Sequence, residues 1–205
     1  MKFGKRLMDV AVSVVGLLVL LPLLCIVALC IKIDSHGSVF YSQARVGKGG
    51  RHFQILKLRS MDAVSSALPA GITVSGDKRV TRVGKILRRY KIDELPQLWN
   101  VLVGDMSLVG PRPELPKYVE TYSAEQRRVL SVLPGITDPA TLVYRHEEEM
   151  LASCEDPEQV YRMRIMPDKL AGNLAYIQNI SLRSDIRIIV ETVGRSFFLV
   201  NQSSR

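Results

Sequence analysis

The sequence predicts an α/β protein that is mostly helical, contains a small β-hairpin and begins with a membrane helix. Three observations carry this prediction. Residues 10–31 contain no charge, two apolar stretches flank the glycine-rich residues 47–50, and apolar residues recur at helical spacing after residue 80. The chain has 205 residues, enough for one domain of ordinary size. We therefore expect residues 1–34 to form the membrane helix and residues 35–205 to form a single domain with interfacial amphipathic helices.

The apolar run from Val10 to Ile31 is long enough to cross a membrane. As a helix it would be about 33 Å long, and the hydrocarbon core of a bilayer is about 30 Å thick. A cleaved signal peptide is the competing interpretation, because Lys2, Lys5 and Arg6 resemble a basic leader. However, the run is too long for a signal peptide and no small-x-small cleavage pattern follows it. Its apolar character on every face also argues against a buried helix of a soluble protein.

Pro22 lies near the middle of this run and leaves two courses open. An interior proline removes a backbone hydrogen bond and kinks a helix, so an ordinary kinked span is one course. A helix broken at Pro22, which enters and leaves through the same leaflet, is the other. Basic residues flank the run on both sides, with Lys5 and Arg6 before it and Lys32 and Arg45 after it. Because positive flanks favour the cytoplasmic side, the charges favour the second course.

The first elements after the membrane run form a hairpin. Residues 39–41 and 53–58 are rich in β-forming residues, and the turn at residues 47–50 separates them. Residues 63–77 contain Ser, Ala, Pro and Gly without a period, which predicts a loop. Apolar residues in Val80–Arg89 fit one helical face, and this pattern predicts a helix.

The remaining elements are helices separated by turns. Leu95, Leu98 and Val101 have helical spacing and predict a second helix, whereas the glycines and prolines of "GDMSLVGPRPELP" predict a loop, ordered or disordered. "SAEQRRVLSVL" predicts a short helix with a serine cap. Residues 181–200 predict a last helix, basic and apolar.

The charge of the chain limits its partners. The formal net charge is +8 and the pI is about 9.6, so nucleic acid, an anionic membrane surface and a phosphorylated substrate all fit. The excess is local, because residues 45–91 hold twelve Lys and Arg residues against Asp62 and Asp77. Only Phe53 and Tyr90 supply aromatic rings there and no recognition motif is present, so we expect no nucleic-acid partner.

The three cysteines indicate no disulfide or zinc site. Cys25 and Cys30 lie in the apolar run, and Cys154 stands alone without metal-ligand spacing. We expect three free thiols on a reducing, cytoplasmic side.

Asp93 and Glu94 are the candidate catalytic residues. One interpretation is structural: Asp93 caps a helix, Glu94 is an acid of its first turn, and Pro96 is tolerated there. The other is chemical, because paired carboxylates bind Mg²⁺ and the cations upstream gather phosphates beside them. Carboxylates, cations and metal together are typical of a phosphoryl-transfer site.

The segment from Val83 to Pro116, "VGKILRRYKIDELPQLWNVLVGDMSLVGPRPELP", resembles the bacterial sugar transferase family, the small monotopic phosphoglycosyl transferases. The resemblance extends over nearly the whole chain through "QARVG", "KLRSM", "LPGIT" and "MPDKL". The later segments "TDPATLVYRHEEEML" and "SLRSDIRIIVETV" resemble the members that start polysaccharide or glycoprotein glycan assembly. The sequence departs from many members at Tyr90-Lys91-Ile92 and at Asp138, which bears on sugar preference.

The resemblance implies a reaction. A sugar-1-phosphate moves from a nucleotide sugar, usually a UDP-sugar, to a polyprenyl phosphate such as undecaprenyl phosphate, and UMP leaves. Asp93 would be the nucleophile that forms a phosphosugar-aspartyl intermediate, and Glu94 would hold Mg²⁺ or handle a proton. A membrane-anchored nucleotide-sugar hydrolase, with water as acceptor, is the alternative function.

The remaining site residues follow from matching motifs. The cations expected to contact phosphate or nucleotide are Lys57, Arg59, Arg88, Arg112 and Arg145. Pro111 and Pro113 would stiffen the loop that presents Arg112. The metal ligands would be Asp93 and Glu94.

The family also implies the location. It points to a re-entrant helix broken at Pro22, which contacts one leaflet and leaves the domain on the cytoplasmic face of the bacterial inner membrane. The expected partners are therefore a nucleotide sugar, polyprenyl phosphate and the membrane. A homodimer is left open.

Overall fold

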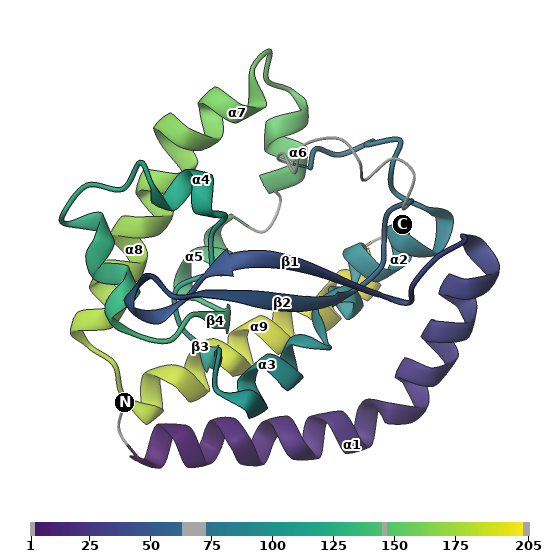
Figure 1. Cartoon of the computed structure of the whole chain (residues 1–205), viewed down its shortest axis with the longest axis horizontal. Helices are drawn as coiled ribbons and strands as arrows, with labels where there is room; N and C mark the ends of the chain where they lie inside the picture. Colours follow the sequence, from purple (N-terminus) through teal and green to yellow (C-terminus); the bar gives the residue numbers. More distant parts are fainter. Residues whose placement is uncertain (1–2, 63–72, 145–146, 203–205) are drawn as a thin grey trace.

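The computed structural model describes residues 3–62, 73–144 and 147–202, and within the last helix it describes side chains only up to Gly194. Helices surround a small β-hairpin, and the long helix α1 (Phe3–Asp34) runs along the lower edge of Figure 1. The last helix, α9 (Leu182–Gln202), passes behind the hairpin. The predicted class, mostly helical with a small antiparallel sheet and an N-terminal apolar helix, is confirmed.

The predicted break at Pro22 is wrong as a secondary-structure assignment. The structure keeps α1 as one helix across Pro22, and Figure 1 shows it bending towards its C-terminal end. A proline removes a single backbone hydrogen bond, so a helix can kink at that point and continue.

The predicted hairpin and the helix after it are confirmed. Strands β1 (Phe40–Val46) and β2 (His52–Leu58) pair antiparallel, with Phe40 opposite Leu58 and Val46 opposite His52. A 3-10 turn, η1 (Lys48–Gly50), joins them. Helix α2 (Arg82–Arg89) follows, and Thr81 caps it by accepting a hydrogen bond from the Gly84 N–H.

The segment expected to be a loop contains a strand. After the 3-10 turn η3 (Ile92–Glu94) and helix α3 (Gln97–Val103), β3 (Ser107–Val109) pairs in parallel with β4 (Gly135–Thr137). The backbones approach closely beside this pair, because a Cβ added at Gly135 would stand 2.1 Å from the Gly110 nitrogen. Glycine is therefore required there. The pairing joins the "GPRP" and "LPGIT" segments.

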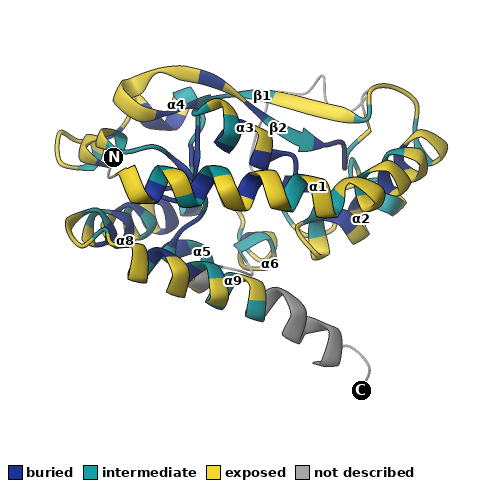
Figure 2. Ribbon diagram, turned by 90° about the horizontal axis from the view of Figure 1, so that it is seen from below, coloured by how far each residue is buried: buried dark blue, intermediate teal, exposed yellow. Residues whose placement is uncertain are grey.

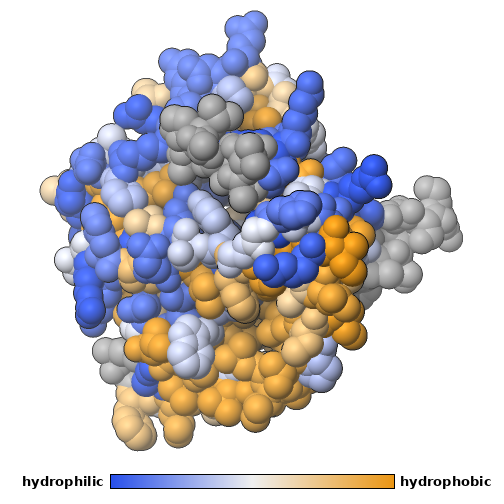
Figure 3. Space-filling model, turned by 45° about the vertical axis from the view of Figure 1, so that its right-hand side comes forward, coloured by the Kyte–Doolittle hydropathy of each residue, from blue (hydrophilic) through white to orange (hydrophobic). Residues whose placement is uncertain are grey.

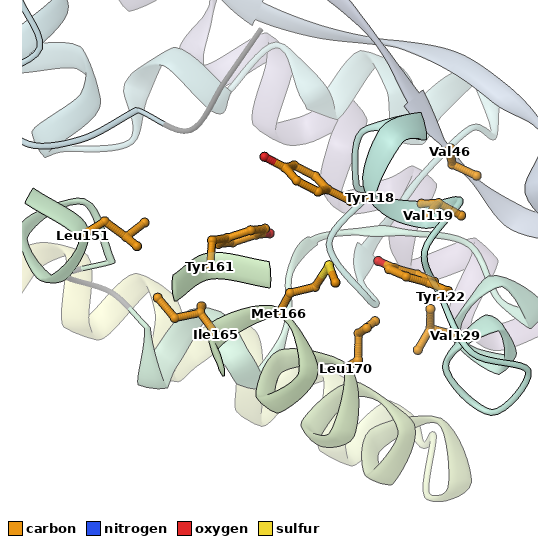
Figure 4. Close-up of a cluster of buried hydrophobic side chains, with 10 residues drawn as sticks. All are labelled: Val46, Tyr118, Val119, Tyr122, Val129, Leu151, Tyr161, Ile165, Met166 and Leu170. Carbon is orange, nitrogen blue, oxygen red and sulfur yellow. The ribbon is translucent and has the colours of Figure 1, made fainter. Parts of the chain in front are cut away.

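The C-terminal half is built of short helices packed on one core. These elements are α4 (Pro116–Val119), η4 (Gln126–Ser131), α5 (Pro139–Val143), α6 (Glu147–Ala152), α7 (Pro157–Val160), the π-helical turn η5 (Tyr161–Ile165) and α8 (Met166–Gln178). The predicted serine-capped helix is the 3-10 helix η4, which has Glu125 at its cap position, and Ser123 before it accepts a hydrogen bond from the Gln126 N–H. Figure 4 shows Tyr118, Tyr122 and Tyr161 gathered in the core of this half.

Helix α1 is joined to the domain by a buried polar face. Lys5, Asp9 and Ser13 lie on one side of the helix at intervals of four residues and are buried, whereas most of its apolar side chains are exposed. In Figure 2 this helix is mainly exposed, with buried residues confined to one side. Within the described residues, α1 is the helix that is long and apolar enough to cross a membrane. Of its most apolar stretch of 18 residues, 11% is buried.

Both ends of α1 contact the domain. Near the start, Lys5 pairs with Asp185 of α9 at 2.7 Å, and Arg6 donates to the carbonyls of Val101 and Leu102 at the end of α3. At its end, the Asp34 carboxylate accepts from the Val83 N–H of α2 at 3.0 Å. The middle of the helix also contacts the domain, because Leu17 and Leu20 pack against the cluster that contains Leu98 and Val101.

Candidate active site

The two carboxylates lie in a tight turn between α2 and α3. Lys91 adopts a left-handed backbone conformation, with φ of 56°, which is uncommon for a residue with a side chain. This residue reverses the chain at the end of α2 and starts η3, which carries Asp93 and Glu94. Such conformations are found at functional sites, where the surrounding packing offsets their cost of about 1–3 kcal/mol.

The structural interpretation of Asp93 as a helix cap is wrong. Helix α3 begins at Gln97, and Pro96 occupies the preceding cap position without a side-chain hydrogen bond. Asp93 and Glu94 are buried one turn earlier, in η3. Pro96 separates η3 from α3, so neither Asp93 nor Glu94 caps helix α3.

Glu94 is held by two cations. Lys57 of β2 donates to its Oε1 atom at 2.7 Å, while Arg112 contacts Oε1 at 2.5 Å and Oε2 at 3.3 Å. Burial alone would raise the pKa of Glu94, but the charges of Arg112 and Lys57 outweigh burial and hold this pKa well below its ordinary value. Glu94 is therefore a carboxylate at neutral pH and a weak base.

Asp93 has the opposite electrostatics. Its side chain is buried, and its Oδ1 atom has no hydrogen-bond partner within the described residues. Burial, followed by the charge of Glu94, raises the pKa of Asp93, although Lys57, Lys91 and Arg88 act in the other direction. A desolvated carboxylate oxygen without a partner is available for reaction or for a cation.

The loop after β3 presents Arg112. Asp138, at the end of β4, accepts a hydrogen bond from the Arg112 N–H at 3.1 Å and another from the side chain of Asn173 at 3.2 Å. Pro111 accepts from the Gly135 N–H at 3.0 Å, and Pro113 accepts from the Arg45 guanidinium at 3.1 Å. The two prolines are buried, and their carbonyls anchor this loop to the rest of the domain.

Two other predicted phosphate contacts point elsewhere in this structure. The guanidinium of Arg59 is buried and donates to the carbonyls of Ile31 and Ser35, at the end of α1. Arg88 pairs with Glu148 at 2.5 Å. Its charge still lowers the pKa of Asp93, so Arg88 lies near the pair without touching it. Arg145 lies outside the described residues.

Several residues that support the site were not among the site residues predicted from the sequence. Asp138 fixes the backbone of Arg112, and Arg45 together with Glu114 and Tyr161 supports the far end of the same loop. The "GPRP" and "LPGIT" segments could have signalled Asp138, because it directly follows the second motif. The contacts of Arg45 join residues far apart in the chain, and no local pattern signals them.

The site fits a magnesium ion that has a single protein ligand. The described residues contain no group of three or more His, Cys, Asp or Glu side chains arranged to hold a metal. Both oxygens of Glu94 are occupied by cations, whereas the Oδ1 atom of Asp93 is unpartnered. Mg²⁺ commonly takes one or two carboxylates and fills its other positions with substrate phosphates and water.

Comparison with known proteins gives the family. Residues 1–198 match the family model described as bacterial sugar transferase. The chain belongs to the bacterial sugar transferase family. The site described above lies where the "DEL", "KLRSM" and "GPRP" segments meet in the fold, through the contacts of Lys57 and Arg112 with Glu94.

Relatives within the family carry specific names. Over 196 residues the chain is 40% identical to the UDP-N-acetylgalactosamine-undecaprenyl-phosphate N-acetylgalactosaminephosphotransferase of Aeromonas hydrophila, covering 93% of this chain and 43% of the relative. It is 41% identical to the UDP-glucose:undecaprenyl-phosphate glucose-1-phosphate transferase of Caulobacter vibrioides, covering 92% and 68%. It is 39% identical to the exopolysaccharide production protein PSS of Rhizobium leguminosarum, covering 92% of each chain. The chain thus spans less than half of the first bacterial sugar transferase and nearly all of the third.

Proposed function

We propose that the protein transfers a sugar-1-phosphate from a UDP-sugar to a polyprenyl phosphate, with undecaprenyl phosphate as the natural acceptor, and releases UMP. This would be the first membrane step of glycoconjugate or exopolysaccharide assembly. Two relatives named as UDP-sugar:undecaprenyl-phosphate transferases support the substrates. The observation that carries the chemistry is the buried Asp93 carboxylate, whose free oxygen lies beside a Glu94 held by Lys57 and Arg112.

Asp93 acts as the nucleophile in the proposed mechanism. Its carboxylate oxygen bonds to the phosphorus that carries the sugar, the bond from that phosphorus to UMP breaks, and UMP leaves with the electron pair. A phosphate oxygen of the polyprenyl phosphate then attacks the same phosphorus, and Asp93 leaves as a carboxylate. Two displacements replace one difficult step, which is the advantage of covalent catalysis.

Glu94 positions the cations Lys57 and Arg112, and these cations bind the phosphates of the donor. A base with a low pKa removes a proton poorly, so Glu94 fits the task of fixing Lys57 and Arg112 better than that of a general base. The planar fork of Arg112 can exchange a carboxylate for a phosphate, because both accept two parallel N–H bonds. The donor diphosphate would therefore bind where Arg112 and Lys57 converge.

Magnesium completes the proposed site. When bound, Mg²⁺ would neutralise the donor diphosphate and polarise its phosphoryl oxygens. Asp93, whose Oδ1 atom is unpartnered within the described residues, would hold the ion through its carboxylate. Lys57 and Arg112 would orient the donor phosphates.

Both ends of α1 would lie on one side of the membrane. Lys5 near its start and Asp34 at its end are both bonded to the domain, so a span that separated them would break one set of contacts. We propose that α1 enters one leaflet of the bacterial inner membrane and that the domain lies on the cytoplasmic face, where nucleotide sugars are made. Figure 3 supports this orientation, because apolar side chains gather on one region of the surface.

Lipid-dependent release of UMP tests the proposal. Purified protein with Mg²⁺ would be given UDP-glucose or UDP-N-acetylgalactosamine, with and without undecaprenyl phosphate, and UMP would be measured together with the lipid product. The transferase predicts UMP and sugar-diphosphate lipid in equal amounts, only when the lipid is present. Steady turnover without lipid, with water as acceptor, would overturn it in favour of a hydrolase.

A further inference from the structure

A cavity of about 320 Å³ lies where the starts of α1 and α9 meet the end of α8. Val109, the last residue of β3, residues 131–133 and Lys48 form the rest of its wall. The two helix starts are in close proximity, because a Cβ added at Gly4 would stand 3.4 Å from Leu182. The lining includes none of the carboxylates and cations of the candidate active site, so the cavity is a separate site.

Two of the charged groups on its wall, Lys5 and Asp185, are paired with each other. The Lys5 ammonium donates to the Val109 carbonyl at 2.9 Å and to Asp185 at 2.7 Å. The Tyr176 hydroxyl donates to the other carboxylate oxygen of Asp185 at 2.6 Å. The apolar lining residues are Val109, Val132, Leu133, Ile180 and Leu182. Paired polar groups and apolar walls suit an apolar ligand better than a polar one.

The surroundings connect the cavity to the surface expected to meet the membrane. Leu182 is 44% exposed on its wall, and in α1 the exposed residues Phe3 and Leu7, at 85% and 61%, are close in sequence to the lining residues Gly4 and Lys5. A hydrocarbon chain can pass from a bilayer into the cavity along these residues without crossing water. Lys48 is exposed and also lines the cavity, so a cation is available for an anionic lipid.

We propose that this cavity binds a hydrocarbon chain of a membrane lipid. The chain could come from the polyprenyl acceptor or from a phospholipid, and the geometry favours the acceptor. Val109 precedes Arg112 by three residues, so their Cα atoms lie within about 11 Å. An acceptor with its chain against Val109 therefore brings its phosphate close to the Arg112 loop. This assignment to the acceptor rests on the proposed transferase function.

Dependence on acceptor length tests the proposal. Ile180→Trp would fill the cavity, and Met163→Trp, at a residue that is 76% exposed and does not line it, is the matched control. For each protein kcat/KM would be measured with phosphates of an eleven-unit and a four-unit polyprenol. Ile180→Trp should lower kcat/KM for the long acceptor about tenfold, the loss expected from unburying about two methylene groups. It should leave the short acceptor and the control within twofold.

A second measurement identifies the source of the chain. Native mass spectrometry would count the phospholipids that remain bound to each purified protein. Loss of bound phospholipid in Ile180→Trp, with an unchanged preference for acceptor length, would support a hydrocarbon site that serves a phospholipid. Val132→Trp, from the opposite segment of the wall, repeats both measurements if Ile180→Trp lowers the melting temperature.

The proposal is overturned if both folded variants retain the length preference and the bound lipid of the unaltered protein. Failure of the transferase function gives a different result, because no lipid-dependent UMP release would then be seen in the unaltered protein. The cavity-filling variants test only the binding of the lipid chain. Turnover with the short acceptor tests the chemistry at Asp93 separately.

Discussion

Asp93 and Glu94 are neighbours in the chain, but their environments drive their protonation in opposite directions. Burial and the charge of Glu94 raise the pKa of Asp93, and Arg112 with Lys57 holds that of Glu94 low in spite of burial. Pairs of titratable groups whose pKa values are driven apart are typical of catalytic sites. The sequence predicted both residues from their motif. It could not predict the opposite pKa shifts of the two residues, because Lys57 and Arg112 reach Glu94 from 37 and 18 residues away.

The acid limb of the pH profile should reflect Asp93. Attack requires the ionised carboxylate, so activity should fall on acidification at a pH above the ordinary aspartate value of 3.8. Glu94→Gln removes the neighbouring negative charge, which lowers the pKa of Asp93 and should move the acid limb of the residual activity to lower pH. Measured kcat against pH for both proteins checks this. An acid limb that stays in place, or moves to higher pH, would contradict the assignment.

Arg112 should matter more than a surface cation. Arg112→Ala removes the fork from Glu94 and from the proposed donor phosphate, and kcat/KM should fall by about 100-fold or more, the size seen when one preorganised donor is removed. Lys85→Ala, on the exposed face of α2, is the control and should retain activity within about twofold. Similar losses in the two variants would reduce Arg112 to one member of a general basic surface.

Among the elements, α1 supports the site in addition to exposing an apolar surface. Its Asp9 carboxylate accepts from the Leu108 N–H at 3.1 Å and from the Ser107 hydroxyl at 2.8 Å, and Lys5 bonds to the Val109 carbonyl. The first two turns of α1 thus hold β3, which leads into the Arg112 loop. From the sequence, Lys5 and Arg6 were interpreted as flanking charges that orient the helix. Their partners are distant in the chain, so no local pattern signalled this second use.

The hairpin and α2 were predicted correctly because alternation and helical period are local signals. The parallel pair β3–β4 was missed for the opposite reason. Each strand has three residues, too few to show a period, and the partners are separated by 28 positions, as Ser107 and Gly135 show. The small helices between residues 139 and 178 were also left unassigned, because short helices owe their stability to tertiary packing.

The Lys5–Asp185 pair should be essential for stability at the start of α1. Lys5→Met leaves the buried Asp185 carboxylate without its cation, which costs about 3–5 kcal/mol, whereas Lys5→Met with Asp185→Leu removes both charges and should recover part of that loss. Lys32→Met, at the exposed far end of α1, is the control. Melting temperatures in one detergent give the comparison. A Lys5→Met protein as stable as the control would show that the pair does not anchor α1.

For the whole molecule, the contacts of α1 bear on its course through the membrane. Its first turns bind α3, β3 and α9, and its last turn binds α2, so both ends are bonded to the domain. From the sequence, the charges on both flanks and Pro22 predict a re-entrant course. The structure adds the bonds that hold the ends, and it replaces the expected break with a bend.

Residues 2 and 205 should both face the cytoplasm. Single cysteines would be placed at these positions in a protein whose natural cysteines have been replaced by serine, and intact cells would be treated with a membrane-impermeant thiol reagent. Neither position should be labelled before the cells are opened, and both should be labelled afterwards. Labelling of residue 2 in intact cells would restore the plain transmembrane span.

Covalent catalysis by Asp93 is the central claim, and the mass of the protein after exposure to donor alone tests it most directly. Without acceptor, the first displacement should stop at the phosphosugar-aspartyl protein. Incubation with Mg²⁺ and the active UDP-sugar should therefore add one sugar-phosphate mass, located by fragmentation on Asp93 and removed by undecaprenyl phosphate. Asp93→Asn should show no adduct while keeping the melting temperature of the unaltered protein. An adduct on another residue, or full lipid-dependent turnover by Asp93→Asn, would contradict the account.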